Sequence, residues 1–175
     1  LLHAARDEQV WRYMNFPPPK SRADMERFIR VAVENELAGK EIPFAVILLS
    51  TGKAVGSTRF IYIDRPNRGV EIGWTWVAPQ WHRTAVNTEA KYLMLCHAFE
   101  VWECHRVELK TDALNVRSRR AIERLGAREE GVFRKYQRTQ GGRMRDTVMY
   151  SILDAEWPEV KSGLERRLWQ PPTAR

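Results

Sequence analysis

The stretch between Val70 and Val101 constrains the fold most, because it predicts a strand, a short loop and a helix in succession. Every second residue at its start is apolar or aromatic, which is the period of a strand. These residues are Val70, Ile72, Trp74 and Trp76. Pro79 has no N–H and ends the pairing, and Thr84 or Asn87 can cap the helix that follows. Free N–H groups at such a helix start favour an anion, most often phosphate, although a connection without a ligand has the same pattern.

The remaining segments predict further elements on both sides of this unit. Helices are expected over 1–14, 21–38, 115–125 and from Trp157 onward, and strands over 44–49, 54–63, 106–111, 131–138 and 144–153. The run at 44–49 is continuously apolar, which predicts a buried strand. One strand–helix–strand unit within an otherwise antiparallel order predicts an α+β protein with a mixed, mostly antiparallel central sheet and helices on both faces. No linker divides the chain, so we expect a single domain over 1–175, with 170–175 as a loose tail.

The composition narrows the possible partners without selecting one. The chain has 175 residues, 43% of them hydrophobic and 29% charged, and its net charge of +7 favours an acidic partner. That partner could be nucleic acid, an anionic membrane surface or a phosphorylated cofactor. No apolar run reaches the roughly 20 residues of a membrane helix. Cys96 and Cys104 form no disulfide framework, which indicates a reducing, cytoplasmic location. The four histidines lack a metal-ligand spacing, so no metal site is expected.

Several short motifs follow one another along nearly the whole chain. They are Glu71-Ile72-Gly73-Trp74, Val77-Ala78-Pro79, Asn87-Thr88-Glu89-Ala90, Asn115-Val116-Arg117-Ser118, Leu125-Gly126-Ala127 with Glu130-Gly131, and Gly142 to Asp146. Their order and spacing resemble the GNAT superfamily of N-acetyltransferases, and most closely the branch that acetylates the N-termini of ribosomal proteins. The resemblance places the family's first strand before residue 1. It implies acetyl-CoA as cofactor, a primary amine as acceptor, above all a protein N-terminus, and a homodimer as a common assembly.

The resemblance also implies where the cofactor binds. The family's pyrophosphate loop falls on 82–87, where His82 replaces Gln or Arg, and Ala85 and Asn87 replace two glycines. The implied cofactor-binding set is Trp76, Val77, His82, Arg83, Thr84, Ala85, Val86, Asn87, Thr88, Asn115 and Arg120. Within it, a backbone N–H near Trp76 and Val77 would bind the thioester carbonyl. Asn115 would bind pantetheine amides but can equally cap a helix, and Arg120 would hold the 3′-phosphate or simply face solvent.

Two residues are candidates for proton transfer. Glu71 is a carboxylate on a mostly apolar strand, and desolvation would raise its pKa into the range of a base at neutral pH. The alternative is a carboxylate that faces solvent or pairs with an arginine. Many family members place a tyrosine acid where this chain has Ile122, so the resemblance implies that Ser118 interacts with the leaving sulfur instead. A serine can relay a proton but not store one, and Ser118 can also serve only in helix capping or packing.

Aromatic residues are candidates for the acceptor pocket, since the family's first two helices and their connection cover that site. They are Trp11, Tyr13, Phe16, Trp74 and Tyr136. The alternative is that they belong to the core. Three other functions stay open: acetylation of a small amine such as a polyamine, amino acid or aminoglycoside; a basic RNA- or ribosome-associated module without catalysis; and an inactive relative that binds acyl-CoA. Nucleic-acid binding is disfavoured because the aromatics are not interleaved with Lys and Arg in an RNA motif.

Overall fold

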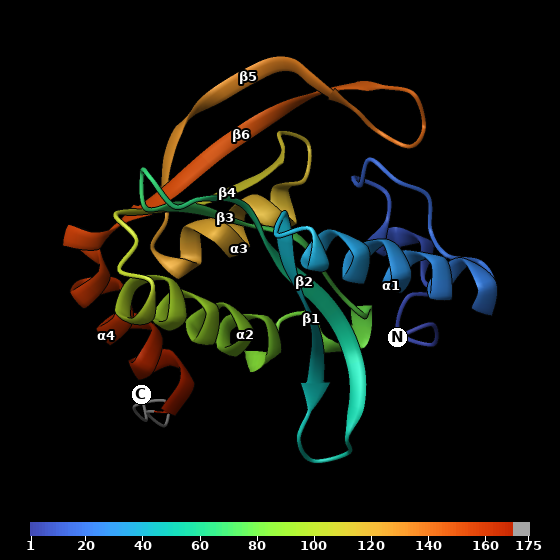
Figure 1. The fold of residues 1–175 in the computed structure, drawn as a ribbon, viewed down its shortest axis with the longest axis horizontal. Coiled ribbons are helices and arrows are strands. Elements are labelled where there is room, and N and C mark those ends of the chain that lie inside the picture. Colours follow the sequence, from blue (N-terminus) through green and yellow to red (C-terminus); the bar gives the residue numbers. More distant parts are fainter. Residues whose placement is uncertain (170–175) are drawn as a thin grey trace, which may run out of the picture.

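The computed structural model describes residues 1–169 and contains a mixed, six-stranded sheet with helices on both faces (Figure 1). The strands are β1 (Glu41–Leu48), β2 (Lys53–Asp64), β3 (Gly69–Val77), β4 (Arg106–Asp112), β5 (Arg128–Arg138) and β6 (Met144–Leu153). Their order across the sheet is β1-β2-β3-β4-β6-β5. Only β3 and β4 pair in parallel, and the other neighbours are antiparallel. The predicted α+β fold class is confirmed, whereas the tail expected at 170–175 lies outside the described residues.

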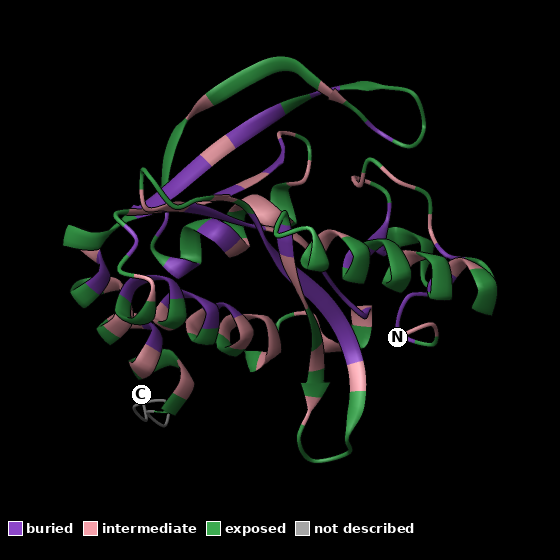
Figure 2. Ribbon diagram, in the orientation of Figure 1, coloured by how far each residue is buried: buried purple, intermediate pink, exposed green. Residues whose placement is uncertain are grey.

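The helices divide the interior into two cores. They are α1 (Arg22–Leu37), α2 (Ala85–Cys96, continued by a π-helical turn over His97–Val101), α3 (Val116–Leu125) and α4 (Trp157–Trp169). The main core joins α2, α3 and α4 to one face of the sheet and includes Leu95, Ile122 and Leu164. The second core joins the N-terminal segment and α1 to the region around Trp76. Figure 2 shows the buried residues along β2, β3, β4 and β6, whereas most of β5 is exposed.

The helix predicted over 1–14 is wrong. Apart from a single 3₁₀ turn at Glu8–Val10, that segment consists of turns and irregular backbone. Two side chains form hydrogen bonds with backbone groups that would pair with each other in a helix. The Trp11 indole Nε1 donates to the Ala5 carbonyl at 2.8 Å, and the Asp7 carboxylate accepts from the Gln9 backbone N–H at 2.9 Å. Burial of Trp11 against Trp76 therefore outweighs the local helical pattern.

The strand predicted at 44–49 is also placed incorrectly, because it begins at Glu41 and is not buried. β1 lies at the edge of the sheet, and Phe44 and Ile47 are exposed. A short apolar run cannot by itself distinguish a central strand from an edge strand. The strand is held at its start by a buried ion pair between Glu41 and Arg59 of β2, at 2.6 Å.

A β-bulge in β3 changes the predicted alternation of its side chains. Ser57 pairs with Trp76 and Arg59 with Gly73, so Thr58 opposes both Trp74 and Thr75. The backbone of Trp74 has a positive φ of 53°, which is rare for a residue other than glycine. Because of the additional residue, Val70 and Ile72 lie in the main core, whereas Trp76 lies in the second core.

The strand β2 approaches the bulged strand closely at Gly56, which generates a stability prediction. A Cβ at Gly56 would clash with the Trp76 carbonyl oxygen, whereas a Cβ at Gly69, in the same sheet, would meet no atom within 4 Å. We expect Gly56→Ala to lower the free energy of unfolding by about 1–3 kcal/mol, the usual cost of overpacking. Gly69→Ala should change it by about 0.5 kcal/mol or less. Urea unfolding measures both, and equal stabilities of the two variants would contradict the close approach.

Candidate active site

The parallel strands β3 and β4 separate soon after they begin. They pair at Gly69 with Arg106, Val70 with Val107, and Glu71 with Glu108, and the pairing ends there. Each strand then leads into a helix, β3 into α2 and β4 into α3. Because the strands are parallel, both helices begin at the same edge of the sheet, beside the opening between the strands. The contact between His82, just before α2, and Arg117, in the first turn of α3, places the two helix starts together.

The start of α2 exposes backbone donors. Thr84 is the N-cap, as one of the two predicted alternatives stated: its hydroxyl accepts from the Val86 N–H at 3.3 Å. Asn87 lies inside the first turn, and the left-handed backbone conformation occurs instead at Arg83, with a φ of 62°. The side chains of Arg83, Thr84 and Ala85 are exposed, while Val86, Asn87 and Thr88 are half-buried. The first N–H groups of a helix have no partner within it, so this exposed start can bind an anion.

His82 connects β3 to α3. Its Nε2 lies 2.8 Å from the Val77 carbonyl oxygen, and its Nδ1 lies 3.0 Å from an Arg117 guanidinium nitrogen. Since arginine can only donate, Nδ1 accepts and the ring proton is on Nε2. Burial, followed by the positive charge of Arg117, lowers the pKa of His82 below its ordinary value. His82 is therefore neutral in this arrangement, and it does not supply a positive charge to a bound anion.

The end of β3 presents its backbone to the opening. The Ala78 N–H donates to the Val55 carbonyl of β2 at 2.9 Å. The neighbouring residues Val77 and Gly56 are therefore a non-hydrogen-bonded pair, in which the N–H and C=O groups of each residue point away from the other strand. The N–H and C=O of Val77 thus point toward the side where β3 has left β4. The carbonyl is the group that accepts from His82.

Glu71 lies where the pairing of β3 and β4 ends, and it is 3% exposed. Its carboxylate forms an ion pair with the Lys110 ammonium of β4 at 2.8 Å, so its partner is a lysine and not the arginine of the alternative interpretation. Burial raises the pKa of Glu71 even though the Lys110 charge opposes this effect. The Lys110 Nζ lies 4.6 Å from the ring centroid of Tyr62 and 5.8 Å from that of Tyr136, so Tyr136 is close to this pair.

The start of α3 contains the second group of expected residues. Asn115 is the N-cap, and its side-chain oxygen accepts from the Ser118 N–H at 3.1 Å. Asn115 and Ser118 are half-buried, whereas Arg120 is exposed. Ile122, in the position of the family's tyrosine, is buried in the main core. The capping role of Asn115 is confirmed, and it leaves the amide NH₂ available for a ligand.

The expected acceptor aromatics occupy different depths. Trp11 is fully buried in the second core, as the alternative interpretation held. Phe16 stacks on Trp74 with the ring centroids 4.3 Å apart and the planes at 15°, and both are half-buried. Tyr13 is half-buried and Tyr136 exposed. The structure therefore brings Phe16 and Trp74 together and leaves Tyr136 on a different strand.

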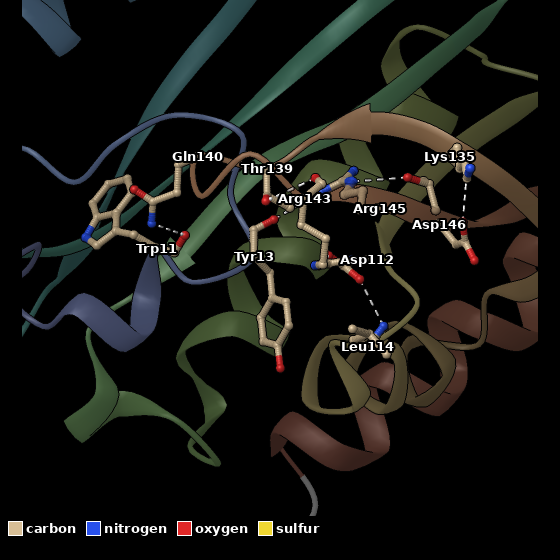
Figure 3. A network of polar contacts seen from close by, with 11 residues as sticks. Trp11, Tyr13, Asp112, Leu114, Lys135, Thr139, Gln140, Arg143, Arg145 and Asp146 are labelled. Carbon is tan, nitrogen blue, oxygen red and sulfur yellow. Dashed lines mark hydrogen bonds and ion pairs between the residues drawn. The ribbon is translucent and has the colours of Figure 1, made fainter.

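A network that the sequence did not predict joins the N-terminal segment to the turn between β5 and β6 (Figure 3). Gln140 donates twice, from its side chain to the Trp11 carbonyl and from its backbone to the Met14 carbonyl, each at 3.1 Å. Arg145 donates to the Tyr13 carbonyl at 3.2 Å. Arg143 pairs with Asp112 at the end of β4, whose side chain is fully buried. The only sequence signal for these contacts is the motif from Gly142 to Asp146.

A shallow cavity of about 650 Å³ lies between the same two segments. Its lining residues are Glu8, Gln9, Arg12, Pro17, Pro18, Lys20, Thr139, Gln140, Gly141 and Arg143. Within residues 1–169, no group of three or more His, Cys, Asp or Glu side chains could hold a metal ion. Over the same residues, no helix is long and apolar enough to cross a membrane.

Comparisons with known proteins agree with this arrangement. The sequence model of the acetyltransferase (GNAT) domain matches residues 1–128. An uncharacterized N-acetyltransferase, p20 of Bacillus licheniformis, is 27% identical over 151 residues, which cover 86% of this chain and 84% of that protein. YdaF, a candidate ribosomal N-acetyltransferase of Bacillus subtilis, is 34% identical over 114 residues, which cover 65% of this chain and 61% of that protein.

Solved structures show the same fold. A GCN5-related N-acetyltransferase from Brucella melitensis superposes with a TM-score of 0.89 at 34% identity, covering 98% of this chain and 76% of that one. Mycobacterium smegmatis RimJ, solved in complex with CoA-disulfide, superposes with a TM-score of 0.81 at 23% identity, covering 95% of this chain and 82% of that one. The mixed sheet with its flanking helices is thus that of the GNAT fold.

The environment of His82 generates a prediction that NMR can check. Titration of its ring should give a pKa below the ordinary value of about 6.5, because burial and Arg117 favour the neutral ring. Since the unfolded chain then binds more protons, the stability contributed by neutral His82 is present above about pH 6.5 and is lost as pH falls through the folded pKa. Arg117→Gln should raise the pKa of His82, whereas Arg120→Gln, an exposed arginine on the same helix, should leave it unchanged. Equal effects of the two variants would contradict the specific contact.

Proposed function

Because the chain belongs to the GNAT family of N-acetyltransferases, we propose that it transfers the acetyl group of acetyl-CoA to a primary amine, the α-amine of a protein N-terminus. One observation supports the first part above all others: the parallel strands β3 and β4 separate after three residue pairs, and two helices begin beside the opening. Such an opening can admit an extended pantetheine arm, whose amides match the free backbone groups of a strand.

The start of α2 is the proposed pyrophosphate site. Its first N–H groups, those of Ala85 and Asn87 on either side of the capped Val86, supply donors that two glycines would otherwise make accessible, and Arg83 adds a positive charge. Neutral His82 acts here as a brace between Val77 and Arg117. On α3, Asn115 is proposed to bind a pantetheine amide through its NH₂ group, and the exposed Arg120 to pair with the 3′-phosphate.

The transfer requires a positioned carbonyl and two proton movements. The amine nitrogen attacks the thioester carbon, a C–N bond forms, the C–S bond breaks and the sulfur leaves as a thiolate. We propose that the Val77 N–H stabilises the oxyanion, because it points into the opening, whereas the N–H of the preceding Trp76 faces Ser57 of β2. Glu71, acting through water, would take the proton from the ammonium, and Ser118 would donate a hydrogen bond to the sulfur.

The environment of Glu71 suits a base at neutral pH. Its raised pKa makes the carboxylate a stronger base than an exposed one, and the Lys110 ion pair fixes its orientation. Lys110 also prevents the buried carboxylate from being permanently neutral, because an adjacent positive charge favours the ionised form.

A polypeptide acceptor is supported by the shape of the acceptor side and by the relatives. The shallow cavity has exposed residues on both walls, such as Arg12, Lys20 and Gly141, and can therefore accept a chain that continues into solvent. Tyr13, Phe16, Trp74 and Tyr136 are proposed to contact the first residues of the acceptor. The name of one relative, YdaF, refers to a candidate ribosomal N-acetyltransferase. A cytoplasmic location and a homodimer are part of the same proposal, and Cys96 and Cys104 are free thiols.

The function is tested by thiol release from acetyl-CoA across a panel of amines. The panel contains peptides beginning with Ala, Ser or Met, together with polyamines, amino acids and aminoglycosides. We expect release with at least one peptide class, and mass spectrometry should locate the acetyl group on the α-amine. Release with small amines alone would reject the N-terminal acceptor and retain the acetyltransferase. No release with any amine, together with no thermal shift by coenzyme A, would reject the proposed function.

The role of Glu71 is tested by Glu71→Gln with an active acceptor from the panel. Loss of a general base should lower kcat by about 10²- to 10⁴-fold. The thermal shift produced by saturating coenzyme A should be retained, since the carboxylate is assigned to the acceptor side. Glu159→Gln, an exposed glutamate on α4, is the matched control and should keep kcat within about twofold. A kcat of Glu71→Gln equal to that of the control would remove Glu71 as the base.

A further inference from the structure

Lys91 is a buried lysine that the proposed reaction does not use. It lies on α2, it is 4% exposed, and its side chain reaches the sheet behind the β3 bulge. Its Nζ lies 2.8 Å from the hydroxyl of Thr58 on β2 and 2.5 Å from the hydroxyl of Thr75 on β3. Among residues 1–169, no carboxylate forms an ion pair with it. A buried ammonium without a carboxylate is costly, because neither water nor an opposite charge compensates its desolvation.

The hydroxyl partners of Lys91 continue into the backbone of the bulge. The two hydroxyl oxygens lie 2.9 Å from each other, and each is 3.4–3.5 Å from the Gly73 carbonyl oxygen. A protonated lysine can only donate, so in that state each threonine accepts from Nζ and has its own proton left. One of these protons can bond the other hydroxyl, and the second can bond the Gly73 carbonyl. The resulting chain runs from Lys91 through two hydroxyls to the residue before Trp74.

The bulge around Trp74 is the segment that these hydrogen bonds hold in place. Trp74 has a positive φ, and a left-handed conformation is strained for a residue with a side chain, so the surroundings must fix it. The bulge directs Trp74 toward Phe16 and sets the register in which the Val77 N–H and C=O face the opening. A change at the bulge would therefore displace both the acceptor-side aromatics and the carbonyl-binding backbone.

We propose, on the basis of the proposed function, that Lys91 is a positioning residue for acetyl transfer, which holds the β3 bulge through Thr58 and Thr75 so that the Trp76–Val77 backbone meets the thioester carbonyl. The ligand-independent part of this proposal is that Lys91 determines the conformation of the bulge. A lysine retained only for stability is not expected at this position, because an apolar side chain of the same length would avoid the desolvation cost.

The protonation state of Lys91 depends on its burial and on the polar groups that surround it. Burial lowers its pKa to about 7, so both protonation states occur near neutral pH. The nearest polar groups on β2 and β3 are the neutral hydroxyls of Thr58 and Thr75. Three carboxylates on the elements packed against α2 have other partners: Glu41 of β1 pairs with Arg59 of β2, Glu71 of β3 pairs with Lys110, and Glu165 of α4 accepts from Tyr92 of α2.

The test compares Lys91→Met with Lys53→Met, which removes an exposed lysine at the start of β2. We expect Lys91→Met to keep or raise the melting temperature and to retain the thermal shift by coenzyme A. Its kcat should fall about tenfold to a hundredfold, the effect of a small misplacement of a reacting group, while the KM for acetyl-CoA changes little. Lys53→Met should match the wild type. A kcat of Lys91→Met within twofold of the wild type would overturn the proposal.

A second pair of variants covers the case in which Lys91→Met does not fold. Thr75→Ser keeps the hydroxyl that contacts Nζ, whereas Thr75→Val keeps the volume and removes it. We expect Thr75→Ser to retain kcat and Thr75→Val to lower it by a factor comparable to that of Lys91→Met. Equal kcat values of the two Thr75 variants would also contradict the proposal.

A measurement without turnover separates this inference from the proposed function. The indole N–H resonances of Trp74 and Trp76 in ¹H–¹⁵N spectra report the bulge directly. They should shift in Lys91→Met, or in Thr75→Val relative to Thr75→Ser, and stay in place in Lys53→Met. Shifted resonances together with a wild type inactive on every amine would reject the acetyl transfer and retain the hold of Lys91 on the bulge. Unshifted resonances would overturn the inference whatever the activity.

Discussion

The short parallel pairing of β3 and β4 is the constraint on which the rest of the site depends. In every other pair of neighbouring strands the ladder continues over most of the shorter strand, but here it ends at Glu71 and Glu108. A longer ladder would occupy the backbone groups of both strands and leave none for a ligand. Because the two strands part, the Val77 N–H becomes available while its carbonyl accepts from His82, and the starts of α2 and α3 lie beside it. The proposed anion site and the proposed carbonyl site thus both depend on the early end of this ladder.

This opening is surrounded by charged and polar side chains that a stability argument alone would not place there. Glu71 is buried at the point where the strands separate, its partner Lys110 is half-buried, and Lys91 is buried behind the bulge. Within residues 1–169, the buried indole N–H of Trp76 has no hydrogen-bond partner. Buried polar groups of this kind cost free energy, so their concentration around one strand is typical of a site that is organised for chemistry.

The sequence was sufficient for the fold class, the order of elements and most caps, because these depend on local patterns. Asn115 was named as a cap from its residue type and position, and Thr84 was one of two alternatives, the other being Asn87. The N-terminal segment could not be predicted, since its conformation depends on Trp11 packing against Trp76, far away in the chain. The bulge at Trp74 was missed for a similar reason: strict alternation has no signal for an additional residue, which only the pairing with β2 reveals.

The candidate site likewise has residues that local patterns predict and residues whose partners come from distant segments. The helix starts that would bind the cofactor lie within continuous motifs and were named from the sequence. The partners of Glu71 and His82 come from other strands and helices, so the sequence could give neither Lys110 nor Arg117 as a partner. Lys91 was hidden for another reason, since a lysine on a helix is ordinarily assigned to the surface.

The two sides of the proposed site differ in how firmly they are anchored in the fold. The proposed cofactor side consists of regular strands and helices anchored in the main core. The N-terminal segment on the proposed acceptor side is held by the small second core and by hydrogen bonds from Gln140, in the turn before β6, and Arg145, at the start of β6. These bonds can open without disturbing the main core. If the proposed assignment holds, substitutions in the N-terminal segment or in the turn can change the acceptor while the donor stays the same, so related chains can differ in what they modify and share the same chemistry.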